Sequence, residues 1–112
     1  MEIVKLDHVN IRTTQLDNMV DWYTNILGMR SGDRPDFPFP GAWMYAGNVA
    51  AVHLVGIDDV PSIGSEVDLK LEHFAFSAKG GAEFEARLQA MSVQYRRADI
   101  PEIGLYQINL WD

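Results

Sequence analysis

The sequence contains no cysteine. This absence excludes disulfides, thiolate metal sites and a cysteine nucleophile, and it leaves imidazole and carboxylate as the candidate metal ligands. No apolar run approaches the roughly 18 residues of a membrane span, and residues 1–15 lack the basic start and apolar core of a signal peptide. We therefore expect a cytoplasmic protein that neither spans nor binds a membrane.

Basic residues are also scarce. Nine Lys and Arg face 16 Asp and Glu, which gives a formal net charge of -7. This balance opposes binding to nucleic acid, whose phosphates require a basic patch, and it favours a small molecule as the partner. A length of 112 residues with 47% hydrophobic and 22% charged residues is typical of one globular domain, residues 1–112.

The chain contains an internal repeat. Segment 71–77, Leu-Glu-His-Phe-Ala-Phe-Ser, matches the pattern of segment 6–12, Leu-Asp-His-Val-Asn-Ile-Arg, and each copy runs into an amphipathic stretch that predicts a helix. Each copy places a histidine third. Two modules that fold alike would aim His8 and His73 at shared space, which suggests a metal site. The alternative is two unrelated strand histidines, each bonded to polar neighbours.

Hydrophobic periodicity predicts the elements of both modules. Module one, residues 1–57, should contain a helix over 16–27 and strands over 3–12, 29–34, 42–46 and 50–56. Module two, residues 71–112, should contain a helix over 82–91 and strands over 71–78, 93–98 and 105–111. Residues 58–70 show no hydrophobic periodicity, which predicts a linker between the modules. The proline-rich, aromatic stretch 34–41 predicts a loop that borders a pocket.

The third histidine, His53, also lies in a predicted strand. Imidazoles combined with a carboxylate suit Zn²⁺, Fe²⁺, Ni²⁺ or Mn²⁺, and spacing alone does not choose among these metals. We predict His8, His53 and His73 as ligands, with His53 either a ligand or a supporting neighbour. The carboxylate is missing from this set, because strand alternation places Asp7 and Glu72 on the opposite faces of their strands.

Other side chains are candidates for the wall and chemistry of a pocket. Tyrosine hydroxyls can donate protons, guanidinium groups can hold a substrate carboxylate, and aromatic and amide side chains can line the cavity. The candidate catalytic residues are Tyr106 and Tyr45, and the candidate substrate-binding residues are Arg12, Arg34, Phe39, Trp43 and Gln107.

Three motifs resemble one superfamily. The opening Leu-Asp-His-Val at 6–9, the helix end Trp-Tyr-Thr-Asn-Ile-Leu-Gly-Met at 22–29 and Leu-Glu-His-Phe-Ala-Phe at 71–76 resemble the vicinal oxygen chelate superfamily. This superfamily groups glyoxalase I, bleomycin resistance proteins, methylmalonyl-CoA epimerase and extradiol dioxygenases. The resemblance implies an α+β fold in which two paired βαβββ modules form a curved mixed sheet around a cup.

The resemblance also implies a ligand set. It assigns metal ligands to the first strand of each module, at His8 and His73, and to the fourth strand, at His53, where glyoxalase I-like members carry Glu. The remaining ligand in the family is a Glu on the eighth strand, and this sequence reaches Trp111-Asp112 where the turn before that strand is expected. We therefore expect a second module without its final strand here, or a last ligand from elsewhere.

Two functions are consistent with these residues. The first is a metal-dependent enzyme, dioxygenase-like or lyase/isomerase-like, in which a divalent metal chelates two neighbouring oxygens of a small oxygenated metabolite. The second is a metal-free binding protein of the bleomycin resistance type, whose cup sequesters a small molecule. The histidine pair favours the enzyme, whereas the negative charge would suit a cationic drug. A homodimer is expected for both.

Overall fold

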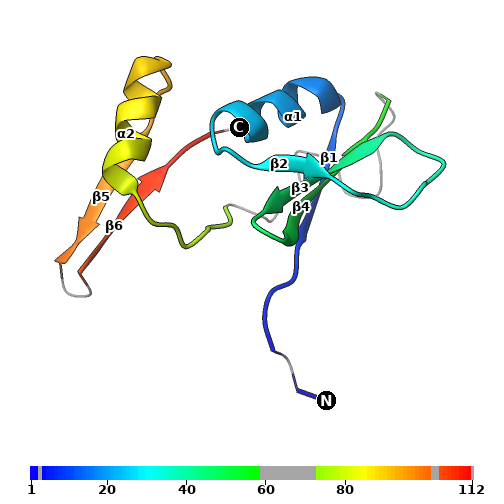
Figure 1. Ribbon diagram of the computed structural model, residues 1–112, viewed down its shortest axis with the longest axis horizontal. Helices are drawn as coiled ribbons and strands as arrows, with labels where there is room; N and C mark the ends of the chain where they lie inside the picture. Colours follow the sequence, from blue (N-terminus) through cyan, green and yellow to red (C-terminus); the bar gives the residue numbers. More distant parts are fainter. Residues whose placement is uncertain (3, 59–72, 102–103, 112) are drawn as a thin grey trace. The chain divides into compact units, whose positions relative to one another are not determined.

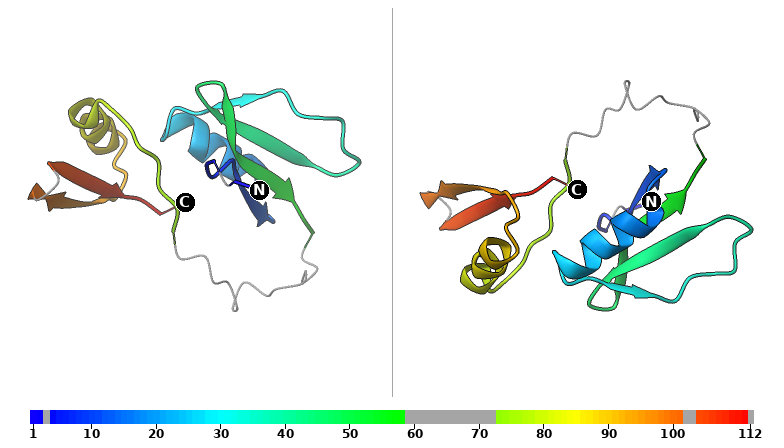
Figure 2. Two further views of the ribbon diagram at one scale, coloured as in Figure 1. Left: turned by 90° about the horizontal axis from the view of Figure 1, so that it is seen from below. Right: turned by 90° about the horizontal axis from the view of Figure 1, so that it is seen from above.

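The computed structural model describes residues 1–2, 4–58, 73–101 and 104–111. The chain divides into two compact units, Met1–Lys70 and Leu71–Asp112, which are described separately (Figures 1 and 2). The predicted linker lies outside the described residues except for Asp58, and so do the first two residues of the predicted strand 71–78. The prediction of one domain over the whole chain stays a prediction.

The first unit has the predicted order of strand, helix and three strands. Its elements are β1 (Val9–Thr13), α1 (Leu16–Asn25), β2 (Arg30–Gly32), β3 (Gly41–Ala46) and β4 (Val49–Gly56). The strands form one mixed sheet in the order β1-β4-β3-β2, in which β1 runs parallel to β4 and the other neighbours are antiparallel. The helical crossover that a parallel pair requires is supplied by α1.

The core of this unit lies between α1 and one face of the sheet (Figure 2). From the helix, Tyr23 is 1% exposed, and from the strands, Met44 and Val52 are fully buried and Leu54 is 1% exposed. The helical periodicity of the apolar residues in α1 explains which of its sides is buried. The chain leaves the helix through Gly28, whose φ of 69° is the left-handed conformation that glycine adopts readily after a helix.

The first strand is shorter than the sequence pattern predicts. A strand over 3–12 was expected, but β1 begins at Val9. The reason is its partner: β4 pairs with β1 only from Val52 onwards, while the earlier residues of β4 pair with β3 alone. Residues before Val9 therefore have no neighbouring strand in this sheet, and strand alternation does not control where their side chains point.

The second unit contains α2 (Gly81–Ala90) and an antiparallel pair, β5 (Arg96–Ile100) and β6 (Leu105–Asn109). The predicted helix and the last two strands are present, with shifted ends. The prediction of a strand over 71–78 is wrong for its described part, since residues 73–78 form no strand. A strand needs a partner for its backbone hydrogen bonds, and in this unit β5 and β6 pair with each other.

An ion-pair network joins the elements of the second unit. Arg97 on β5 donates hydrogen bonds to Glu85 on α2 at 2.7 Å and to Asp99 at 2.9 Å. The hydroxyl of Tyr95 donates to the same Glu85 carboxylate at 3.1 Å, and Leu88 of α2 is fully buried.

Neither of the two helices in the described residues has the length and apolar character of a membrane span.

Candidate functional site

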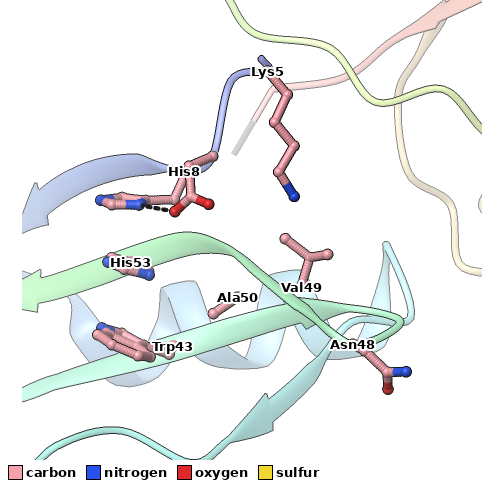
Figure 3. Close-up of a pocket in the computed structure, with 8 residues that line it drawn as sticks. Lys5, His8, Trp43, Asn48, Val49, Ala50 and His53 are labelled. Atoms are coloured by element: carbon pink, nitrogen blue, oxygen red, sulfur yellow. Dashed lines mark hydrogen bonds and ion pairs between the residues drawn. The ribbon is translucent and has the colours of Figure 1, made fainter. Parts of the chain in front are cut away.

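An open pocket of about 590 Å³ lies in the first unit, where the arm before β1 meets β3 and β4 (Figure 3). On β4, His53 alternates with the buried Val52 and Leu54, so its side chain lies on the face of the strand opposite to the core. The pocket is lined by Lys5, Asp7, His8, Trp43, Asn48, Val49, Ala50 and His53.

Three rings are stacked in this pocket. The rings of His8 and His53 are 3.9 Å apart between centroids at an angle of 15°, and His53 lies 4.1 Å from Trp43 at 8°. Figure 3 shows His53 between the other two. Sheet register explains the contact of His53 with Trp43, because these two residues are paired across β4 and β3, whereas His8 precedes β1 and stacks on the other face of the His53 ring. Two of the three predicted ligands, His8 and His53, thus come together.

The carboxylate of Asp7 orients His8. Its Oδ2 lies 2.8 Å from Nδ1 of His8, and because an ionised carboxylate only accepts, Nδ1 carries the proton and donates it. The lone pair of the neutral imidazole is then on Nε2, where it can bind a metal. The prediction that Asp7 lies on the opposite face from His8 is wrong, because both residues precede β1 and are free of strand alternation.

The hydrogen bond to His8 also lowers the pKa of Asp7. We predict that Asp7→Asn weakens metal binding by roughly 10–100-fold, the range typical for losing a residue that orients a histidine ligand. The reason is that an amide does not select the tautomer of His8 as a carboxylate does. Isothermal titration of metal into chelator-treated protein would measure the effect. Asp21→Asn, on the exposed side of α1, is the matched control. Equal affinity in the two variants would contradict the orienting role.

Burial lowers the pKa of His53, and the nearby His8 lowers it further, against smaller opposite contributions from a backbone hydrogen bond at Ala50 and from Asp7. The neutral imidazole, which is the metal-binding form, is therefore favoured at neutral pH. A depressed pKa means that the unfolded chain binds this proton more tightly. The contribution of neutral His53 to the free energy of unfolding is therefore fully present above about pH 6.5, the ordinary pKa of histidine. It is lost as the pH falls through the lower pKa that His53 has in the folded protein.

We predict that His53 titrates below 6.5, the ordinary value for histidine, in metal-free protein. Proton NMR of the imidazole C–H resonances would measure its pKa. His8→Phe is the informative comparison, since it keeps a ring stacked on His53 but removes the charge. In this variant the pKa should rise part of the way towards 6.5, because burial is the larger cause. A value at or above 6.5 in the unsubstituted protein would contradict this assignment of causes.

Two of the predicted site residues of the first unit, Tyr45 and Arg34, donate hydrogen bonds to backbone carbonyls of the loop before β3. The hydroxyl of Tyr45 donates to the carbonyl of Asp33 at 2.7 Å. The guanidinium of Arg34 donates to the carbonyl of Phe39 at 2.9 Å and lies 5.0 Å from the ring centre of Phe39. Arg12 is exposed on β1 and pairs in register with Val55. Of the predicted substrate-binding residues, only Trp43 lines the pocket.

The remaining predicted site residues belong to the second unit. The guanidinium carbon of Arg97 lies over the ring of Tyr106, 4.1 Å from the ring centroid. Gln107 is exposed on β6. His73 is exposed in the segment before α2. Across the described part of the chain, no three His, Asp or Glu side chains form a group that could hold a metal ion. The roles of these residues stay predictions.

Sequence reasoning missed half of the pocket. Lys5, Asn48, Val49 and Ala50 line it without having been singled out. Asn48 lies in the turn between β3 and β4, where Gly47 has a φ of 60°. No sequence signal pointed to Lys5, which lies in an arm outside any regular element.

Comparison with known proteins establishes the family. Residues 5–94 match the model of the Glyoxalase/Bleomycin resistance protein/Dioxygenase superfamily. The match covers most of the chain, so the chain belongs to this superfamily, and the resemblance inferred from its motifs is confirmed. A plant protein, "Glyoxylase I 4" of Arabidopsis thaliana, is 25% identical over 108 residues, which are 94% of this chain and 62% of that protein. The chain thus spans less than two thirds of this relative.

Solved structures share the fold. A lactoylglutathione lyase from Agrobacterium tumefaciens aligns with a TM-score of 0.70 at 17% identity, over 100% of this chain and 88% of that one. The trypanothione-dependent glyoxalase I of Leishmania major aligns with a TM-score of 0.60 at 21% identity, over 96% and 86%. An integron cassette protein from Halifax Harbour sewage outfall gives 0.61 at 20%, over 84% and 76%. The predicted α+β class with a mixed sheet is confirmed.

Proposed function

We propose that this chain is a metal-dependent enzyme in which His8 and His53 hold a divalent ion. The observation that carries the proposal is the meeting of these two imidazoles, from the entrance of β1 and from β4, in one open pocket. Membership of the superfamily supports it, since glyoxalases and dioxygenases are among its members. His73 belongs to the second unit, and its role as a ligand stays a prediction from the repeat.

The donor set is consistent with such an ion. Two imidazoles suit Zn²⁺, Fe²⁺, Ni²⁺ or Mn²⁺, and His8 already has its Nδ1 proton bonded to Asp7, as metal-binding histidines typically do. The two rings are stacked, so the ring of His8 must turn about its side-chain bonds before nitrogens of both imidazoles can face one ion. His8 is free to do so because its side chain is 40% exposed.

The residues around the pair define what the pocket can do. A bound divalent ion would supply Lewis-acid polarisation of substrate oxygens, as both dioxygenase-like and lyase/isomerase-like chemistry require. Trp43 covers one face of His53 and limits its rotation. Val49 and Ala50 give the pocket an apolar side, against which a short carbon chain can pack. The pocket volume is within the range of small-molecule sites.

Chelator treatment followed by metal restoration tests the proposal. Turnover of small carbonyl and catechol substrates should disappear after removal of metal and return with one of the four ions. Turnover that is unchanged by thorough chelation would overturn the metal-dependent mechanism.

We also propose that the protein is a homodimer in the cytoplasm. Light scattering of the purified protein would measure its oligomeric state.

The rival function is metal-free sequestering of a small molecule. The stack of His8, His53 and Trp43 favours it to a degree, because parallel rings present a flat aromatic surface on which a planar ligand can bind without a metal. Ligand binding that is as tight in chelator-treated protein as in metal-loaded protein, together with no turnover, would establish this rival.

A further inference from the structure

Lys5 is the one fully charged cation in the pocket lining. It comes from the arm before β1, and Figure 3 shows its side chain extending past His8 towards Val49. Within the described residues, Lys5 forms no ion pair. A lysine ammonium that lines a pocket without an ion pair is available to a ligand.

We infer that Lys5 binds an anionic group of the substrate, a carboxylate or a phosphate, while the substrate's neighbouring oxygens face His8 and His53. This inference rests on the proposed function, because it takes the same pocket as the substrate site. It specifies the substrate class as a small oxygenated anion with a short carbon skeleton. It also assigns the anion-binding role to a residue that the sequence pattern had not indicated.

The electrostatics of the pocket support an anion at this position. The one carboxylate in the lining, Asp7, accepts the hydrogen bond of His8. The lining thus carries one ammonium and one carboxylate, and a divalent ion on the histidines would make the pocket positive. In a chain with a net charge of -7, such a local excess of positive charge selects anions.

The alternative cation for this role is already bonded elsewhere. Arg34 was predicted to hold a substrate carboxylate, but its guanidinium bonds the carbonyl of Phe39 and stacks on the rings of Phe37 and Phe39. It does not line the pocket. The amide of Asn48 points away from Lys5 in Figure 3, so the proposed anion contact is made by the ammonium group.

Weak-binding probes test the inference directly. Pyruvate, its neutral analogue pyruvamide and inorganic phosphate would each be titrated into the whole chain, with and without metal, and followed by NMR chemical shifts of backbone amides. The variants are Lys5→Ala, Lys5→Arg and the control Lys79→Ala, an exposed lysine of the second unit. Circular dichroism would verify that each variant is folded.

We expect Lys5→Ala to weaken pyruvate binding about 2–5-fold, the range of a solvent-exposed charge pair. Lys5→Arg should retain most of the affinity, and Lys79→Ala and pyruvamide binding should show no change. Stronger binding of phosphate with the same dependence on Lys5 would support the inference and identify phosphate as the anion. Equal anion affinity in the unsubstituted protein and Lys5→Ala, or no anion binding, would overturn it.

The test separates this inference from the proposed function. Metal binding with anion affinity independent of Lys5 would overturn the inference and leave the metal site standing. Anion binding that depends on Lys5 in a protein that takes up no metal would support the anion site and contradict the metal-dependent enzyme.

Discussion

Replacing His8 with alanine should abolish metal retention while leaving the fold intact. His8 is exposed and precedes β1, so its removal deletes a proposed ligand and a stacking partner of His53 without opening a cavity in the core. Losing a direct ligand should cost more than the roughly 10–100-fold that follows loss of an orienting residue. Elemental analysis and metal titration would measure the loss. His73→Ala should have the same effect if His73 is the third ligand.

Asn10→Ala is the matched control for His8→Ala. Asn10 is also exposed and lies two residues further along, directly opposite His53. This variant should keep its metal, and both variants should unfold at similar denaturant concentrations. Full metal occupancy in His8→Ala would remove that residue from the site, and the same result in His73→Ala would remove His73.

Replacing Leu54 with alanine should destabilise β4, the strand that carries His53. Leu54 is 1% exposed and packs in the core beneath the sheet. Leu54→Ala removes buried methyl groups and leaves a cavity, which should lower the free energy of unfolding by about 2–5 kcal/mol. Because Leu54 adjoins His53 on β4, loosening of the strand should also weaken metal binding. Denaturant unfolding of the metal-free protein would measure the change in the free energy of unfolding separately from the change in metal binding.

Val49→Ala is the control for the same strand. Val49 begins β4 and is 42% exposed, so its truncation leaves no closed cavity. We expect a loss of less than about 1 kcal/mol from this variant. If Leu54→Ala were as stable as Val49→Ala, the core assigned to the first unit would be wrong.

Much of the first unit could be predicted from the sequence. The apolar spacing of residues 16–27 predicted α1, and the alternating pattern of residues 50–56 predicted the strand that carries His53. These features depend on local periodicity, which the sequence displays directly. The meeting of His8 and His53 followed from the family resemblance alone, because the repeat concerns His8 and His73 and no local pattern states which strands become neighbours.

The missed features depend on where elements stop. Asp7 bonds His8 because β1 begins later than its apolar pattern suggests, and that boundary is set by the reach of β4. The strand predicted over 71–78 is absent from its described part, residues 73–78, because β5 and β6 pair with each other, which no pattern within the segment reveals. Lys5 belongs to an arm without regular structure, and only three-dimensional placement identifies it as part of the pocket.

Elemental analysis shows whether the chain holds a metal ion. The protein would be purified without chelator or added metal, and its intact mass would be recorded on the same sample. We expect about one equivalent of iron, manganese, nickel or zinc per chain, and the identity of the metal would direct the choice of substrates. Absence of metal from a chain that also takes up none of the four ions on titration would contradict a metal-dependent enzyme and favour the sequestering function.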